Sequence, residues 1–409
     1  MEKKQLCQLV MNSLLFLLVI THSYMGLLTF LPTITPLINL QNIPNSKQTL
    51  VSTHAQTNQT SSSRIPRLAY SISGTKGDLE SLWRTLRAIY HPRNVYVVHL
   101  DLESPNSERE ELASRIKNDK IFAKMGNVHV IVKANMVTYR GPTMISNTLH
   151  ACAVLLKKSK DWDWFINLSS SDYPLVTQDD ILHIFSSLPR NLNFVDHTSR
   201  LGWKEMHRAR PLIIDPGLYL SEKSNVYWVT QSRELPTAFK LFTGSAWMVL
   251  SREFVYYCVL GYDNLPRTLL MYYTNFISSS EGYFQTVICN APKFTQTIVN
   301  HDLHFIQWDW PPKQHPRTLT LADKSKMIGS NVPFARKFRH NDPVLDRIDV
   351  ELLGWRNESF VPGGWCEGSP NCSEVGDSTR LKPGKGAGRL ARLMYRIVKS
   401  RKSRGNQCT

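Results

Sequence analysis

Two short turns of small residues each present one carboxylic acid. In the first turn, the serines 169–171 follow an apolar run of strand length, 164–168, and lead to Asp172. In the second turn, the serines 278–280 lead to Glu281 and a glycine. Small residues let a ligand approach the backbone, and a carboxylate beside a ligand can accept a proton as a general base. Asp172 and Glu281 are therefore candidates for acid–base chemistry.

Both acids also have an ordinary structural interpretation. Aspartate in a turn often bonds to nearby backbone, so Asp172 could simply close the loop before Pro174. Glu281 stands at the head of a predicted helix, 283–289, where an acid complements the helix dipole. Two such turns in one chain nevertheless exceed what packing requires, which favours a functional site.

A third stretch, 202–210, places several cations beside an aromatic ring. Lys204, Arg208 and Arg210 lie within a few positions of Trp203 in this stretch. Arginine and lysine bind anionic groups through charge-assisted hydrogen bonds, so the stretch suits an anionic or sugar ligand. A solvated charged loop has the same composition, and the sequence leaves both interpretations open.

Strands and helices alternate in the part of the chain that must position these residues. Apolar runs at 68–73, 95–100, 128–132 and 164–168 predict strands, with helical spacing at 79–89 and 145–156 between them. This alternation predicts an α/β fold with a parallel sheet and right-handed crossovers. Ligands bind beyond the carboxyl ends of such strands. One rim should therefore gather Gly74, Asp101, Tyr139 and Asp172.

The net charge of +16 is concentrated in one segment. Residues 380–404 contain ten lysines and arginines and no acid, so the rest of the chain is only mildly basic. This distribution argues against nucleic acid as a partner. We predict instead that 361–409 is a cysteine-containing, basic C-terminal extension, in which the tail from Gly384 has the composition of a surface-binding segment.

The N-terminus has the pattern of a membrane anchor. Two lysines in 1–8 precede 9–31, a largely uncharged run long enough for a bilayer of about 30 Å. A cleaved signal peptide is the alternative, although its apolar region is usually shorter. The polar segment 32–64 reads as a flexible luminal stem before a catalytic domain at 65–360. This order predicts a single-pass type II protein of the Golgi membrane with its catalytic domain in the lumen.

Other short motifs fit a luminal chain. Glycosylation sequons occur at Asn58, Asn357 and Asn371. Cys366 and Cys372 are close enough in sequence to form a disulfide. The sequence does not fix the connectivity of the remaining luminal cysteines, which are Cys152, Cys258, Cys289 and Cys408.

Several ordered motifs resemble the core-2/I-branching glycosyltransferase family, and most closely its plant branch of β-glucuronosyltransferases that act on arabinogalactan proteins. The motifs are found at 68–73, 97–101, 166–174, 242–247 and 280–284. The resemblance implies a GT-A-like, Rossmann-type nucleotide-sugar fold. It also implies a UDP-sugar donor, inversion at the anomeric carbon and no metal cofactor.

The same resemblance implies roles for individual residues. Glu281 matches the catalytic base, and Lys337 and Arg317 match the pair that binds the diphosphate. The other implied positions are donor-binding Ser71, Ser73, Asp101, Tyr139 and Asp172, and acceptor- or sugar-binding Gly244, Ser245 and Trp247. An acidic donor would need a further cation, for which Lys204, Arg208 and Arg210 are the candidates.

One string imitates a metal site. Many GT-A enzymes hold a divalent ion through Asp-x-Asp at the end of a strand, and Asp161 and Asp163 have this spacing. They precede the strand 164–168, however, and so belong to the rim opposite the expected ligand crevice.

We therefore expect a metal-independent, inverting transferase that moves glucuronic acid from UDP-glucuronic acid to a galactan, a glycan acceptor on arabinogalactan proteins. A β-1,6-N-acetylglucosaminyl- or xylosyltransferase, or an inactive membrane-anchored glycan-binding protein, remains an alternative. A glycosidase would also show two carboxyls, at a separation of about 5 to 10 Å across the sugar. The position of Asp172 in a nucleotide-side turn argues against that class.

Overall fold

The computed structural model describes residues 64–219, 225–311, 313, 315–355, 360–366, 372, 374–403 and 407–408. All of them belong to one unit, Ser61–Thr409. The predicted anchor 9–31, nearly all of the stem, and the sequons at Asn58, Asn357 and Asn371 lie outside the described residues. Within the described part, every helix is too short or too polar to cross a bilayer.

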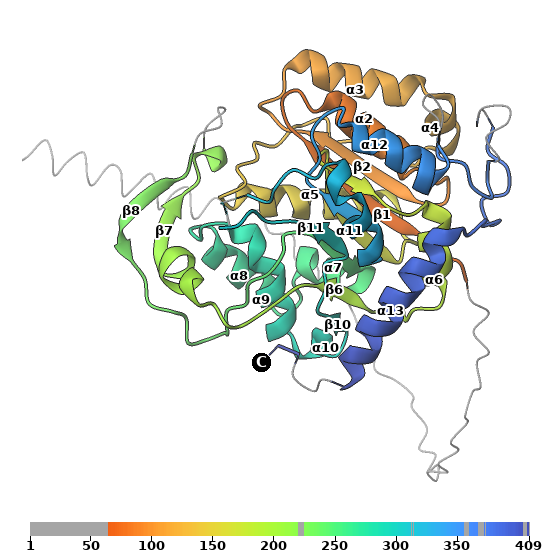
Figure 1. Cartoon of the computed structure of the whole chain (residues 1–409). Helices are drawn as coiled ribbons and strands as arrows, with labels where there is room; N and C mark the ends of the chain where they lie inside the picture. Colours follow the sequence, from red (N-terminus) through yellow and green to blue (C-terminus); the bar gives the residue numbers. More distant parts are fainter. Residues whose placement is uncertain are drawn as a thin grey trace, which may run out of the picture. The chain divides into compact units, whose positions relative to one another are not determined.

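A seven-stranded sheet in the order β10-β6-β9-β4-β1-β2-β3 forms the centre of this unit (Figure 1). Its strands are β1 (Leu68–Gly74), β2 (Val95–Leu100), β3 (Val128–Val130), β4 (Trp164–Ser169), β6 (Asn193–Val195), β9 (Met248–Ser251) and β10 (Ile298–Val299). As predicted, β1 to β4 pair in parallel. Strand β9 instead runs antiparallel to β4 and β6, which makes the sheet mixed.

Two smaller sheets extend the fold. They contain β5 (Asp172–Pro174), β11 (His304–Ile306) and β12 (Phe334–Arg336) in one, and β7 (Pro211–Ile214) and β8 (Tyr227–Ser232) in the other. In the first, β5 pairs antiparallel with β12, so that Asp172 lies opposite Arg336. In the second, β7 and β8 form an antiparallel ribbon. It lies beside α8 at the left of Figure 1.

The helices surround the central sheet. They are α2 (Leu79–Ala88), α3 (Asn106–Asn118), α4 (Lys120–Met125), α5 (Thr143–Lys158), α6 (Gln178–Ser186), α7 (Arg252–Leu260), α8 (Leu265–Tyr273), α9 (Tyr283–Asn290), α10 (Pro292–Thr295), α11 (Lys324–Ser330), α12 (Pro343–Ile348) and α13 (Lys385–Ser403). Short 3₁₀ and π turns occur at Glu205–Ala209, Pro216–Leu218, Ser279–Glu281, Leu321–Asp323 and Asp349–Leu353.

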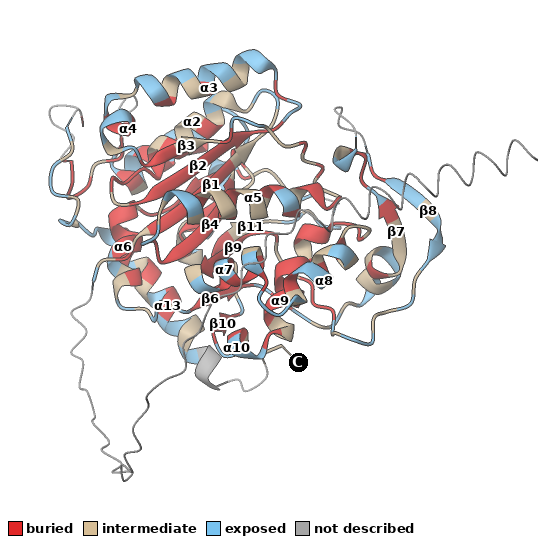
Figure 2. Cartoon of the chain, turned by 180° about the vertical axis from the view of Figure 1, so that it is seen from behind, coloured by how far each residue is buried: buried red, intermediate tan, exposed pale blue. Residues whose placement is uncertain are grey.

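The alternation of side chains along β1 divides the core into two clusters. Leu68, Tyr70 and Ile72 pack with residues of α2, α6, α12 and α13. Ala69 faces the other way and packs with residues of α5, α7, α8 and α9. Successive side chains of a strand point to opposite faces, so a strand covered by helices on both faces is apolar throughout. Figure 2 shows the central strands as a buried band between these layers.

The C-terminal extension packs onto the same core. Leu390 and Leu393 of α13 are buried in the cluster that contains Leu68. Upstream of α13, the carboxylate of Asp179 accepts the backbone N–H groups of Gly364 and Lys382 at 2.7 and 2.6 Å. The acid at the start of α6 therefore holds the segment that leads to α13.

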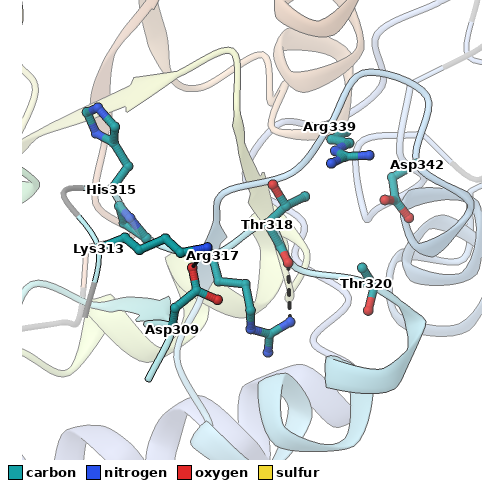
Figure 3. Close-up of a pocket in the computed structure, with 9 residues that line it drawn as sticks. Asp309, Lys313, His315, Arg317, Thr318, Thr320, Arg339 and Asp342 are labelled. Atoms are coloured by element: carbon teal, nitrogen blue, oxygen red, sulfur yellow. Dashed lines mark hydrogen bonds and ion pairs between the residues drawn. The ribbon is translucent and has the colours of Figure 1, made fainter. Parts of the chain in front are cut away.

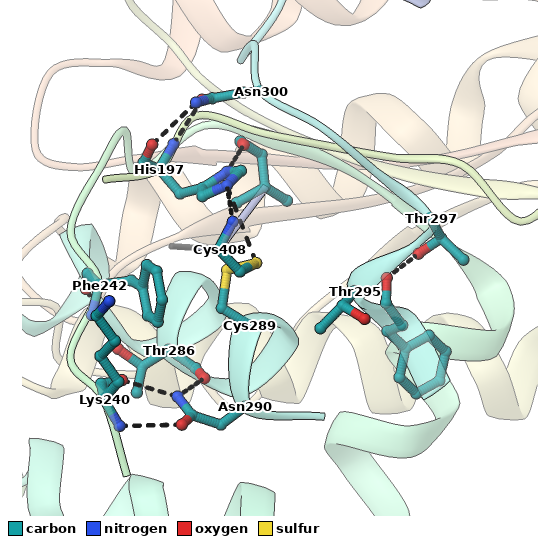
Figure 4. Close-up of a disulfide and its surroundings, with 12 residues drawn as sticks. His197, Lys240, Phe242, Thr286, Cys289, Asn290, Thr295, Thr297, Asn300 and Cys408 are labelled. Atoms are coloured by element: carbon teal, nitrogen blue, oxygen red, sulfur yellow. Dashed lines mark hydrogen bonds between the residues drawn. A yellow bond between two sulfur atoms is a disulfide. The ribbon is translucent and has the colours of Figure 1, made fainter. Parts of the chain in front are cut away.

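Two disulfides are present among the described cysteines. The predicted Cys366–Cys372 bond is confirmed. A second bond joins Cys289 to Cys408, next to His197, and fixes the chain's end against α9 (Figure 4). Cys152 and Cys258 are buried free thiols.

Candidate active site

Glu281 ends the short Ser279–Glu281 turn and faces a cavity of about 410 Å³. Its Oε1 accepts a hydrogen bond of 3.1 Å from the Tyr139 hydroxyl. Its Oε2 forms an ion pair with Arg208. The Glu281 side chain remains 17% exposed. The carboxylate is thus oriented by two partners while it stays accessible from the cavity.

Backbone contacts with the loop before β9 fix the position of Glu281. The Glu281 carbonyl accepts bonds from Gly244 N at 2.8 Å and Thr243 Oγ1 at 3.1 Å. A Cβ at position 244 would lie 1.8 Å from the Asp196 carbonyl oxygen, so this close approach requires glycine. Gly244 therefore contributes to the site by holding the turn that carries Glu281.

Tyr139 stays protonated beside Glu281. Burial, followed by the adjacent Glu281 carboxylate, raises the pKa of Tyr139 well above its usual value. Tyr139 consequently remains a hydrogen-bond donor. Arg208 lies over the ring of Trp203, with its guanidinium carbon 5.2 Å from the ring centroid. This stacking holds the guanidinium beside the carboxylate.

The other two cations of the 202–210 stretch have different partners. Lys204 Nζ lies 3.2 Å from Thr243 Oγ1, and burial, then the nearby Arg208, lowers the pKa of Lys204. Arg210 forms ion pairs with Glu205 and Glu234 at 3.0 and 2.8 Å. Of the three predicted cations, the structure brings Arg208 to the Glu281 carboxylate.

A second cavity, of about 530 Å³, has a lining residue in common with the first. Figure 3 shows the side chains that line this second cavity. Its lining includes Arg317, Arg339 and His315. His315 also lines the cavity of Glu281, where its ring centroid lies 6.3 Å from that of Tyr139. The guanidinium of Arg317 bonds to Asp323 at 3.0 Å. The two cavities thus share His315; Glu281 lines the first, and Arg317 and Arg339 line the second.

Lys337 is close to this second cavity through its backbone. Its carbonyl accepts a 2.8 Å hydrogen bond from Leu319 N, so the segment that follows Arg317 runs beside Lys337. Lys337 directly follows β12 and is half-buried. The fold therefore brings together two predicted diphosphate-binding segments that are separated in sequence.

The carboxylate of Asp172 is enclosed. The residue is 1% exposed, and its oxygens accept hydrogen bonds of 2.9 Å from Arg336 Nε and 2.9 Å from Trp247 Nε1. A further bond comes from the backbone N–H of Ser169. The guanidinium carbon of Arg336 lies 3.3 Å from the Trp247 ring centroid. Asp172 thus fixes an arginine and an indole behind the site.

Of the predicted donor residues on β1 and β2, Ser73 and Asp101 lie at the carboxyl ends of those strands, whereas Ser71 lies in the middle of β1. Ser71 is buried within β1, and Ser73 Oγ accepts a 3.2 Å bond from Asn147. Asp101 follows β2, is 2% exposed and accepts the Thr75 hydroxyl at 2.9 Å. Ser245 makes local contacts, since its Oγ accepts the Trp247 N–H at 3.2 Å.

The Asp-x-Asp string lies before β4, at the opposite end of the strand, as predicted. Asp163 accepts the backbone N–H of Arg67 at 2.8 Å and the guanidinium of Arg64 at 2.7 Å. Asp161 forms an ion pair with Arg67. Both acids therefore anchor the segment that enters β1.

Residues that the sequence did not mark as candidates complete the surroundings of the site. Arg140, Trp228 and His315 line the cavity of Glu281, and Arg336 fixes Asp172. In the sequence, Arg140 directly follows the predicted Tyr139, and Arg336 directly precedes the predicted Lys337. This adjacency was the only clue in the sequence to the two arginines. Trp228 belongs to the mostly exposed strand β8. It lines the cavity only because the folded chain places β8 beside Glu281.

Comparison with known proteins identifies the relatives of the chain. The family model described as Core-2/I-Branching enzyme matches residues 68–328. Beta-glucuronosyltransferase GlcAT14A of Arabidopsis thaliana is 64% identical over 348 residues, which cover 84% of this chain and 78% of that protein. Beta-glucuronosyltransferase GlcAT14B of the same plant is 61% identical over 84% of this chain and 80% of that protein.

More distant similarities extend to other transferases. Xylosyltransferase oxt of Drosophila melanogaster is 27% identical over 74% of this chain and 35% of that protein. Among solved structures, mouse xyloside xylosyltransferase 1 covers 68% of this chain and 99% of that chain, with 13% identity. Its TM-score of 0.31 is too low to establish a common fold.

Proposed function

Because the chain belongs to the Core-2/I-branching enzyme family and is a glycosyltransferase, we propose that it transfers glucuronic acid from UDP-glucuronic acid to a galactan acceptor. The names of the relatives that are 61 to 64% identical support the choice of sugar. The resemblance of the sequence motifs to the plant branch supports arabinogalactan proteins as carriers of the acceptor. The predicted GT-A-like donor site, Golgi location and N-terminal anchor belong to the same proposal.

The main structural support for this proposal is the geometry of Glu281. In an inverting displacement, an acceptor hydroxyl attacks the anomeric carbon of the donor while the bond from that carbon to the diphosphate oxygen breaks. A carboxylate that faces the cavity takes the proton of the hydroxyl as the new bond forms. Tyr139 and Arg208 orient the Glu281 carboxylate for this step.

Negative charge develops on the diphosphate as UDP departs, and the site must stabilise this charge. Lys337 and Arg317 belong to neighbouring segments beside the second cavity, which adjoins that of Glu281. Fixed cations stabilise such charge electrostatically, as a coordinated metal ion does in other enzymes. We therefore propose a metal-independent reaction in which Lys337, supported by Arg317, holds the diphosphate.

Turnover of the full-length chain with UDP-glucuronic acid and a β-galactan tests this proposal. Transfer should persist in excess EDTA, and Lys337→Ala should lower the rate by about 10²-fold, as expected for one lost oxyanion-stabilising group. Loss of activity in EDTA with recovery in Mn²⁺ would reject metal independence. Absence of turnover with any UDP-sugar would favour a glycan-binding protein, and transfer of xylose or N-acetylglucosamine alone would correct the donor.

A further inference from the structure

The cavity of Glu281 contains more positive than negative groups. Two arginines, Arg140 and Arg208, and two histidines line it together with Glu281, which is its single acid among the described residues. The ion pair with Glu281 neutralises Arg208. The second arginine therefore leaves this cavity with an excess of positive charge.

Arg140 is held in place by its backbone and by an aromatic ring. Its carbonyl oxygen accepts a 2.7 Å bond from Ser278 N, immediately before the turn that carries Glu281. Its guanidinium carbon lies 5.7 Å from the ring centroid of Trp228. No carboxylate of the described residues pairs with Arg140. Its guanidinium is thus positioned at the cavity with unused hydrogen-bond donors.

The three cations of the 202–210 stretch already have partners within the protein. Arg208 bonds to Glu281, Lys204 lies beside Thr243, and Arg210 pairs with two glutamates outside the cavity lining. Arg140 is therefore the arginine best placed to meet a charged group of a bound sugar.

The chemistry of these groups specifies a ligand. The planar fork of arginine matches a carboxylate with two parallel hydrogen bonds. The half-exposed indoles of Trp203 and Trp228 offer apolar faces to a pyranose ring in the same cavity. We propose that Arg140 is the specificity-determining residue that binds the carboxylate of a hexuronic acid. This inference rests on the proposed function. It adds the residue that distinguishes an acidic sugar from a neutral one.

The carboxylate has two sources that share this chemistry. It belongs either to the glucuronosyl group of the donor or to an acidic sugar that the acceptor already carries. Both place a hexuronate beside Glu281, and donor binding separates them from acceptor use.

The test measures the affinity of the full-length chain for three nucleotides by calorimetry. Arg140→Gln should weaken the binding of UDP-glucuronic acid by about 10- to 100-fold, the effect of losing a charged hydrogen-bonding partner. Binding of UDP and of neutral UDP-glucose should not change. Arg140→Lys should recover part of the loss, because a lysine keeps the charge without the fork.

Arg115→Gln is the matched control. Arg115 also lies over an indole, 5.8 Å from the Trp83 ring centroid, but on the surface of α3. Its substitution should leave all three affinities unchanged. A loss that Arg115→Gln reproduces would show that removal of any stacked arginine disturbs the protein, and would overturn the assignment.

The remaining outcomes separate the two sources and the proposed function. If donor affinities are unchanged but Arg140→Gln raises the KM of a uronate-bearing acceptor and not of its carboxyl-reduced form, the carboxylate is the acceptor's and the assignment stands. Equal weakening of all three nucleotides, or no effect on donor or acceptor, overturns it. A wild-type chain that transfers neutral sugars and ignores UDP-glucuronic acid refutes the proposed donor, whereas intact discrimination among both donors and acceptors in Arg140→Gln refutes this inference alone.

Discussion

The turns that carry Asp172 and Glu281 have nearly the same sequence and opposite surroundings. Each consists of three serines followed by an acid. Asp172 is 1% exposed and bonded to an arginine, an indole and a backbone amide. The Glu281 side chain is 17% exposed, has two side-chain partners and faces a cavity. Enclosure therefore favours a structural role for Asp172, while access favours a chemical one for Glu281.

This difference also distinguishes the two arginines that pair with these acids, Arg336 and Arg208. Arg336 neutralises the enclosed Asp172 carboxylate, and its 11% exposed side chain packs on Trp247. Arg208 neutralises a carboxylate that must still accept a proton from the acceptor. The same type of ion pair thus joins two parts of the fold in one region and, in the proposed reaction, orients the base in the other.

The largest expected effect is the loss of turnover in Glu281→Gln. Glutamine keeps the size of the side chain and one acceptor oxygen but cannot take the proton, so the rate should fall by about 10²- to 10⁴-fold. Donor binding and the melting temperature should be retained. Initial rates, calorimetry with UDP and thermal unfolding measure these quantities.

Glu80→Gln is the control, because Glu80 pairs with Arg115 on the surface. It should keep full activity. Near-normal turnover of Glu281→Gln would mean that another group is the base and that Glu281 merely complements the following helix.

Asp172→Asn should reduce stability instead of specifically removing the chemistry. The change leaves the buried Arg336 guanidinium without its counter-charge, which costs about 3 to 5 kcal/mol when a buried pair is broken. Urea unfolding measures this loss. Asp346→Asn removes one partner of an exposed pair, with the acid 71% exposed, and should cost at most about 1 kcal/mol.

A result that would break the comparison is an Asp172→Asn protein of normal stability without donor binding. Asp172 would then contact the donor directly. The structural assignment predicts the opposite: donor affinity should be retained by the fraction that folds.

The smallest expected effect is that of Trp247→Phe. Phenylalanine keeps a ring beneath Arg336 but removes the N–H that donates to Asp172 at 2.9 Å, a charged hydrogen bond worth about 1.5 to 3 kcal/mol. Trp162→Phe removes an indole bond to the Leu155 carbonyl and should cost about 1 kcal/mol. Urea unfolding compares the two variants.

Activity of the same proteins sharpens the interpretation. Trp247 was implied as a sugar-binding residue by the family motifs, whereas its N–H is used inside the protein. A drop in turnover without loss of stability in Trp247→Phe would show that its ring contacts a ligand.

Much of the fold follows from local pattern. The apolar runs of β1, β2 and β4 and the helical spacing of α2 and α5 predict these elements within a few positions. Their parallel pairing follows from the alternation of strands with helices. The antiparallel pairing of β9 was not predicted, because a short apolar run does not reveal its neighbours or direction.

The candidate site could also be predicted only in part, because local patterns identify residues but not their neighbours in the fold. Its motifs identify Glu281, Tyr139 and Lys337, all of which lie near the two cavities. Arg140 and Trp228 have no distinctive local pattern. They become part of a site because the β7–β8 ribbon and the loop before α5 meet beside Glu281.

By itself, the sequence determined the strand order along the chain, the two acid-bearing turns and the family to which they belong. Tertiary structure decided which acid is accessible. Asp172 is enclosed by an arginine 164 positions away, and Glu281 is oriented by groups 142 and 73 positions away. Local residue types set what a side chain can do, but burial and partners come from segments that meet only in the folded chain, and these decide whether an acid supports the fold or takes a proton.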